Sequence, residues 1–97
     1  MNAVDTLKIE YPGNDAWEKF VSVFRPAWTQ WQDKEKYLRI MHDEELAIVL
    51  TATIGARCTT WFVSACGALD KRSPEEVLIY EGDGINVIRT LLMRMPR

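Results

Sequence analysis

The stretch RSPEEVLIYEGDGINVIRTLLMRM, residues 72–95, decides the fold class of this chain. Ser73-Pro74-Glu75-Glu76 places a hydroxyl at the N-cap of a helix, proline at its first position and a carboxylate at its third, which together make a capping box. A second helix is predicted after Asp83, because the apolar residues that follow recur three and four positions apart. They are Ile85, Ile88, Leu91, Leu92 and Met95.

A long apolar segment precedes this stretch and predicts two further helices. The β-branched residues Ile48 and Val49 also fit a buried strand. The length and the helical spacing of the apolar residues favour a helix over 43–54. We expect Gly55 to end that helix and a second one to occupy residues near 57–65.

The N-terminal half also carries helical spacing, but with weaker boundaries. Asn14 or Asp15 is a candidate N-cap for a helix with an apolar face. Pro26 is expected to end or kink that helix, because proline lacks the backbone N–H that the helix interior needs. Asp33 is a candidate cap for the next helix. The apolar residues of the first of these helices are Trp17, Phe20, Val21 and Phe24.

The first eleven residues show a different pattern, in which apolar and charged side chains alternate. The alternating residues are Leu7, Lys8, Ile9, Glu10 and Tyr11. Alternation predicts a short strand, or an extended arm, that stops at Pro12-Gly13. The expected fold is therefore all-α, a small bundle of about five helices, with or without this extended N-terminal segment.

Length and charge limit the possible functions. The chain has 97 residues and a net charge of −2, which fits one domain and gives no basic excess for binding phosphate groups. Residues 1–42 form a helical segment without a clear helix-turn-helix, and we expect them to pack with residues 43–97 as one compact domain. No apolar run approaches the ~20 residues of a membrane span, and no secretory signal is present, so we expect a cytoplasmic protein.

The chain is poor in residues that carry catalysis or bind metals. His42 is the only histidine, and Cys58 and Cys66 are the only cysteines, which is too few for a zinc site with two ligand pairs. The two cysteines lie about two helical turns apart, so we expect free thiols rather than a disulfide. No phosphate-binding or nucleophile motif is present. We therefore expect no enzyme activity, no catalytic residue, no metal and no cofactor.

An ordered series of residues in the C-terminal half gives a more specific prediction. The series is Gly55, Trp61-Phe62, Ala68-Leu69-Asp70-Lys71-Arg72-Ser73-Pro74, Leu78, Gly84, Val87 or Ile88, and the final LLMRM. In order and spacing, residues 46–95 resemble the toxin-binding domain of the MbcA/ParS/Xre antitoxins. This resemblance implies an all-helical, oligomeric antitoxin of a bacterial type II toxin–antitoxin operon. Its partner would be a toxin that consumes NAD or transfers ADP-ribose from it.

Two features depart from that family. Its members usually place a helix-turn-helix DNA reader before this domain, and residues 1–42 show no credible one, so we do not expect operator binding here. Asp70-Lys71 also replaces the Gly-Gly-like turn of the family. Two alternatives stay open from the sequence: a DNA-binding transcriptional regulator, and an orphan accessory protein of a phage or mobile element.

The resemblance and the residue types together predict a partner-binding surface on the loop 69–73 and the helix 85–95. Arginine and methionine are favoured at protein interfaces. The loop leucine and Trp61 fit a core position as well as a contact. The predicted partner-binding residues are Leu69, Arg72, Arg89, Leu92, Met93, Arg94 and Met95.

Overall fold

A computed structural model describes residues 2–95 of the chain. Within these residues it contains seven α-helices and no β-strand, so the all-α prediction is confirmed while the expected number of about five helices is too low. The helices are α1 (Ala3–Ile9), α2 (Asn14–Thr29), α3 (Lys34–Met41), α4 (Glu44–Thr53), α5 (Cys58–Val63), α6 (Pro74–Tyr80) and α7 (Gly84–Arg94). Two short 3₁₀ turns occupy Gly55–Arg57 and Gly67–Leu69.

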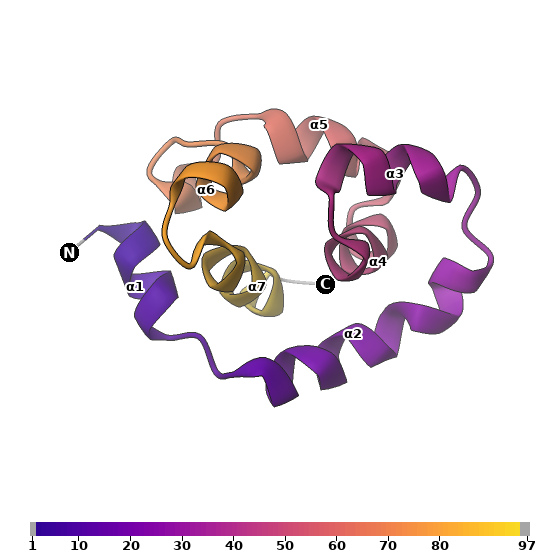
Figure 1. Ribbon diagram of the computed structural model, residues 1–97, viewed down its shortest axis with the longest axis horizontal. Helices are drawn as coiled ribbons and strands as arrows, with labels where there is room; N and C mark the ends of the chain where they lie inside the picture. Colours follow the sequence, from indigo (N-terminus) through magenta and orange to yellow (C-terminus); the bar gives the residue numbers. More distant parts are fainter. Residues whose placement is uncertain (1, 96–97) are drawn as a thin grey trace.

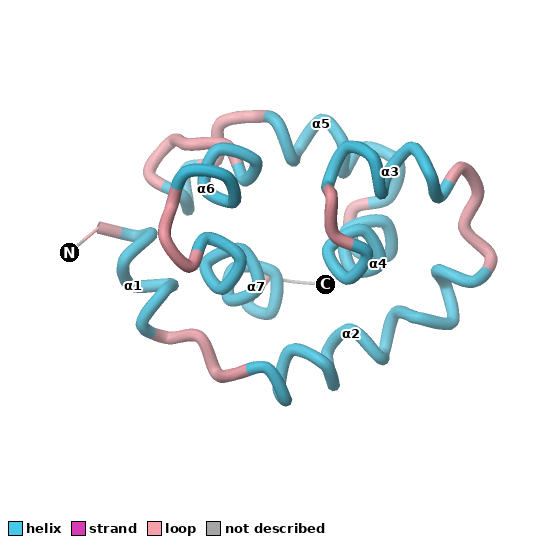
Figure 2. Tube along the Cα trace, in the orientation of Figure 1, coloured by secondary structure: helices cyan, strands magenta, loops and turns pink. Residues whose placement is uncertain are grey.

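Helices α4 and α7 lie in the middle of the molecule, where Figure 1 views them nearly end-on. Helix α2 runs along one side and packs on α4, while α1 and α6 pack on α7. Helices α3, α5 and α6 cover the opposite side. The connections between the helices are short, as the pink segments of Figure 2 show. The N-terminal helices thus pack directly against helices of the C-terminal half.

The hydrophobic core is centred on α4. Every residue from Leu46 to Leu50 is fully buried, because neighbouring helices cover α4 on several sides. Trp17 of α2 and Phe62 of α5 are the largest of the fully buried side chains. Because α4 is covered on several sides, its sequence lacks a polar face. For the same reason its apolar run also fits a buried strand.

The predicted N-terminal strand or extended arm is wrong, because this segment forms α1. Val4 and Leu7 lie three residues apart and are buried on the same side of the helix. The Asn2 side chain caps the first turn, and the Asp70 carboxylate accepts hydrogen bonds from the backbone N–H groups of Ala3 and Val4, at 3.2 Å each. The alternating pattern failed because the group that stabilises this helix lies 66 residues further along the chain.

Helix α2 also differs from its predicted boundaries. It continues through Pro26 instead of ending there, and both Pro26 and Ser22 are exposed, so water can replace the hydrogen bond that proline cannot donate. Its N-cap is Gly13 rather than Asn14 or Asp15, and no side chain caps this end.

The capping box predicted from the sequence is confirmed. The Ser73 hydroxyl accepts from the Glu76 backbone N–H at 3.0 Å, and the Glu76 carboxylate accepts from the Ser73 N–H at 3.1 Å. The hydrogen bond from the Ser73 backbone N–H lowers the pKa of the Glu76 carboxyl. Asp43, at the start of the helix predicted over 43–54, caps α4 with its side chain, whereas Asp33, the candidate cap of α3, adopts left-handed backbone angles and its side chain makes no cap bond.

The contact between α6 and α7 depends on one glycine. A Cβ atom at Gly84 would lie 2.1 Å from the backbone oxygen of Val77, closer than any real contact. Gly84 therefore lets the start of α7 touch the backbone of α6. This close approach fixes the position of α7, the helix that carries most of the predicted partner-binding residues.

Candidate partner-binding surfaces

The loop 69–73 is held in place by the rest of the protein. Leu69 is fully buried, and Asp70 and Lys71 have φ angles of 58° and 67°, in the left-handed region that favours glycine. The backbone N–H of Cys66 bonds to the carbonyl of Arg72 at 3.0 Å and closes the loop. Because the Asp70 carboxylate caps α1, the loop is also attached to the N-terminus.

Glu81 connects this loop to α1 through two ion pairs. Its carboxylate lies 2.9 Å from Nη1 of Arg72 and 2.9 Å from Nζ of Lys8. The hydrogen bond from Arg72, followed by that from Lys8, lowers the pKa of the Glu81 carboxyl. The hydrogen bond to Glu81 raises the pKa of the Lys8 ammonium. Arg72, a predicted partner contact, therefore already has a partner within the chain.

Arg89 lies in a polar cluster that joins α7 to α2 and α4. Its Nη2 is 3.2 Å from Oε1 of Glu45, its Nη1 donates to the Tyr11 hydroxyl at 3.1 Å, and its guanidinium lies 5.1 Å from the centre of the Trp17 ring. Trp17 Nε1 donates to the same Glu45 oxygen at 3.1 Å, and Arg25 lies 3.7 Å from the other oxygen. Only 16% of the Arg89 side chain is exposed, so most of it faces the protein interior.

The last turn of α7 places the other predicted residues in three environments. Leu92 is buried in the core. Met93 and Met95 are partly buried and pack against the core from its edge. Arg94 is half exposed and pairs with Glu10, just after α1.

Helix α1 is therefore the main feature of this region that the sequence did not reveal. It lies on α7 and beside the loop 69–73, and ion pairs from Lys8 and Glu10 reach residues on either side of it. Of the predicted residues, Leu69 and Leu92 lie in the core, and the three arginines are paired with carboxylates of the chain. Their role in binding a partner stays a prediction.

A second surface has the opposite character, because its cations have no acidic partner. Among residues 2–95, Lys36 and Arg39 of α3 and Arg57, just before α5, form no ion pair. Helix α3 packs against α5, and Lys36 acts electrostatically on Cys58, the first residue of α5. Lys36 therefore lies within electrostatic range of the start of α5, and Arg57 immediately precedes that start in the sequence.

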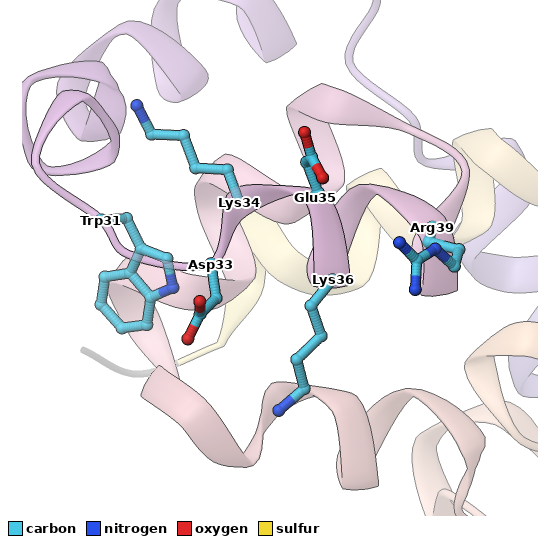
Figure 3. A pocket seen from close by; sticks show the side chains of 6 residues that line it. All are labelled: Trp31, Asp33, Lys34, Glu35, Lys36 and Arg39. Carbon is cyan, nitrogen blue, oxygen red and sulfur yellow. The ribbon is translucent and has the colours of Figure 1, made fainter.

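Two open depressions border this pair of helices. The first has a volume of about 560 Å³, and Figure 3 shows the side chains that line it. They are Trp31, Asp33, Lys34, Glu35, Lys36 and Arg39. The second has a volume of about 510 Å³ and is lined by Ile54, Arg57, Thr60 and Trp61. Trp61 is partly exposed, unlike its neighbour Phe62, so it offers an aromatic surface to a ligand.

The remaining titratable residues include side chains of the types that bind metals, among them His42 and the two cysteines. No group of three His, Cys, Asp or Glu side chains between residues 2 and 95 could hold a metal ion. His42 is exposed at the end of α3, and Cys58 and Cys66 are free thiols, as expected. None of the helices in this part is both long enough and apolar enough to cross a membrane.

Comparisons of the chain with protein-family models, curated proteins and solved structures found no match.

Proposed function

We propose that this chain is an antitoxin-like protein-binding domain of a bacterial toxin–antitoxin pair. In this proposal it neutralises a cognate toxin, which consumes NAD or transfers ADP-ribose, by covering the toxin's active site. The chain contributes no catalytic group. Its task is to present a stable surface of the right shape and charge.

One observation supports this proposal: the motif series occupies demanding structural positions within one continuous helical unit. Gly84 permits the contact between α6 and α7, Ser73-Pro74 begins α6, and Phe62 and Leu69 are buried beneath them. A chance match in sequence would not be expected to place its glycine and its capping residues at the positions that need them. The spacing of the series thus has a physical basis in the fold.

To inhibit a toxin by covering its active site, the chain needs a surface that keeps its shape on binding. The Arg89–Glu45 pair joins α7 to α4, the close contact at Gly84 joins α7 to α6, and a backbone hydrogen bond closes the loop 69–73. A surface fixed in this way loses little conformational entropy on association, which favours tight binding.

Co-expression with the product of the adjacent open reading frame tests the proposal. We expect a stable complex, and we expect the partner to consume NAD, or to transfer ADP-ribose, when it is purified without this chain. Gly84→Ala is a test variant, because disturbed packing between α6 and α7 should weaken the complex. Absence of any complex with either neighbouring product, or a partner without activity on NAD, would contradict the proposal.

Self-association is also part of the proposal. Ile79 and Tyr80 of α6 are 62% and 78% exposed, and such side chains are frequent at interfaces between protein copies. Light scattering during gel filtration should give a mass of at least twice the 11.2 kDa of one chain. The double variant Ile79→Ser/Tyr80→Ser should shift this mass towards that of the monomer. A monomer at all concentrations would contradict this part.

A further inference from the structure

We infer that the surface between α3 and α5 binds a segment of a protein partner that presents a large apolar side chain flanked by carboxylates. We call it the α3–α5 surface and define it by Lys36, Arg39, Ile54, Arg57 and Trp61. The inference deepens the proposed function and rests on it, because it specifies the chemistry of the partner. It also differs from the surface expected from the sequence, which lies on the loop 69–73 and α7.

The charges of the molecule distinguish the two surfaces. Arg72, Arg89 and Arg94 each have a carboxylate partner within the chain. Lys36 and Arg57 have none in the described residues, so their ion-pairing capacity is available to a ligand. Unpaired cations on one surface attract an acidic partner, accelerate its association and favour one orientation.

The depression beside these cations supplies the apolar part of the site. Ile54 and Trp61 form its apolar lining, and its volume of about 510 Å³ is large enough for a bulky side chain. Tryptophan and arginine are the residue types that most often dominate the energy of protein interfaces, especially around a desolvated pocket. Trp61 and Arg57 line the same depression, which provides an apolar anchor and a charge beside it.

The acidic residues nearby restrict where the partner's carboxylates can lie. In Figure 3 the carboxylate of Glu35 points away from Lys36, towards the other side of α3, while Lys36 extends towards the neighbouring helix. Asp33 lies near Trp31, at the far end of the first depression. The carboxylates of a ligand should therefore approach Lys36, Arg39 and Arg57 rather than the Trp31 end.

An acidic protein segment fits this surface better than a nucleic acid. The second depression is lined mainly by apolar groups, and only a few unpaired cations surround it. A chain with a net charge of −2 also lacks the extended basic surface that phosphate backbones require. The experiment must therefore distinguish binding of a nucleic acid from binding of a protein partner.

The experiment measures the affinity of the full chain for the co-expressed product of the adjacent open reading frame. The test variant is Lys36→Glu/Arg57→Glu. The control is Lys19→Glu/Ser22→Glu/Val23→Glu on α2, outside both candidate surfaces, which also lowers the net charge by four, and all three residues are exposed. Circular dichroism confirms that each variant is folded.

We expect the dissociation constant to rise at least tenfold in the test variant and less than threefold in the control. Trp61→Ala should weaken binding at least fivefold, and the affinity of the unmodified chain should fall as salt is raised. An unchanged constant in the test variant, or an equal loss in both charge variants, would overturn the inference while the proposed function stands. If the unmodified chain forms no complex, the proposed function fails and the inference fails with it.

A labelled 15-nucleotide thymidine strand serves as the second probe. We expect no binding at the salt concentration at which the protein complex forms. The inference would be overturned if the unmodified chain binds this strand and the Lys36→Glu/Arg57→Glu variant does not. That result would assign the surface to nucleic acid.

Discussion

Arg89 and Glu45 join α7 to α4, with the guanidinium Nη2 3.2 Å from the carboxylate Oε1. The same carboxylate oxygen accepts from the Trp17 indole of α2, so three helices meet at one group. This cluster replaces purely apolar packing at the point where α2, α4 and α7 converge. Charged hydrogen bonds with limited exposure to solvent are stronger than those on an open surface.

Arg89→Met should therefore destabilise the fold by about 2 kcal/mol, because it leaves Glu45 without the less exposed of its two arginine partners. Urea denaturation followed by tryptophan fluorescence measures the change. Arg94→Met is the control, since its ion pair with Glu10 is half exposed and should contribute less than about 1 kcal/mol. Equal losses in the two variants would contradict the role given to the Arg89 cluster.

Gly84→Ala should lower stability by about 1–3 kcal/mol or more, because the added methyl group would collide with the Val77 backbone and separate α6 from α7. Gly82→Ala is a matched control two residues earlier, where an added Cβ meets nothing within 4 Å. Thermal unfolding of the two variants should give clearly different midpoints. A Gly84→Ala variant as stable as Gly82→Ala would show that the two helices are not in close contact.

The sequence predicted those parts of the fold that depend on neighbouring residues. The capping box at Ser73 and the cap at Asp43 are local hydrogen bonds between residues three positions apart, and both are present. Helix α1 was missed because its stabilising partner Asp70 is distant in sequence. The sequence left open whether α2 ends or kinks at Pro26, because tolerance of proline depends on exposure, which the local pattern does not show; the helix continues through this residue.

For the candidate sites, too, the sequence predicted residue types, whereas the contacts of those residues depend on tertiary packing. Side-chain type identified arginines in the C-terminal half as possible contacts, but the acidic partners Glu45, Glu81 and Glu10 come from other helices or their ends. The α3–α5 surface was not predicted, because Lys36 and Arg57 are 21 positions apart and their helices meet only through tertiary packing. In the sequence, this surface could have been indicated only by Trp61, which lines the same depression as Arg57.

Asp70→Gly should loosen α1, because the variant keeps the left-handed backbone at this position but loses both acceptors for the N–H groups of Ala3 and Val4. A loss of about 1 kcal/mol is expected from the removal of a helix cap. Hydrogen exchange should be faster in α1 and unchanged in α4. Asp83→Gly is the control, since Asp83 has similar backbone angles but its side chain makes no cap bond. Unaltered protection of α1 in Asp70→Gly would refute this account of its stability.

The two cysteines should react at different rates with a thiol reagent. Burial raises the pKa of the Cys58 thiol to about 11, so at pH 8 roughly one molecule in a thousand carries the thiolate, and the side chain is also inaccessible. Cys66 is only partly buried. Ellman's reagent should label one thiol rapidly in the folded protein and the second only in denaturant, and Cys66→Ser should abolish the fast phase. Rapid labelling of both thiols would contradict the burial of Cys58.

The Glu81 ion pairs should make stability depend on pH in the acidic range. Because the folded state lowers the pKa of Glu81, its carboxylate stabilises the fold above the ordinary value of 4.5, and this contribution is lost as the pH falls through the lower folded value. The loss of stability between pH 6 and pH 3, measured by urea denaturation, should be smaller in Glu81→Gln than in the unmodified chain. Glu75→Gln, at a residue without an ion pair in residues 2–95, should behave like the unmodified chain. Identical pH profiles for Glu81→Gln and the unmodified chain would exclude this contribution.

Titration of the partner's NAD-dependent activity with this chain tests the central claim most directly. The proposed antitoxin role predicts that activity falls to the background level at a fixed molar ratio, and that Lys36→Glu/Arg57→Glu shifts the titration to at least tenfold higher concentration. Full activity of the partner in the presence of a saturating, folded chain would contradict the claim.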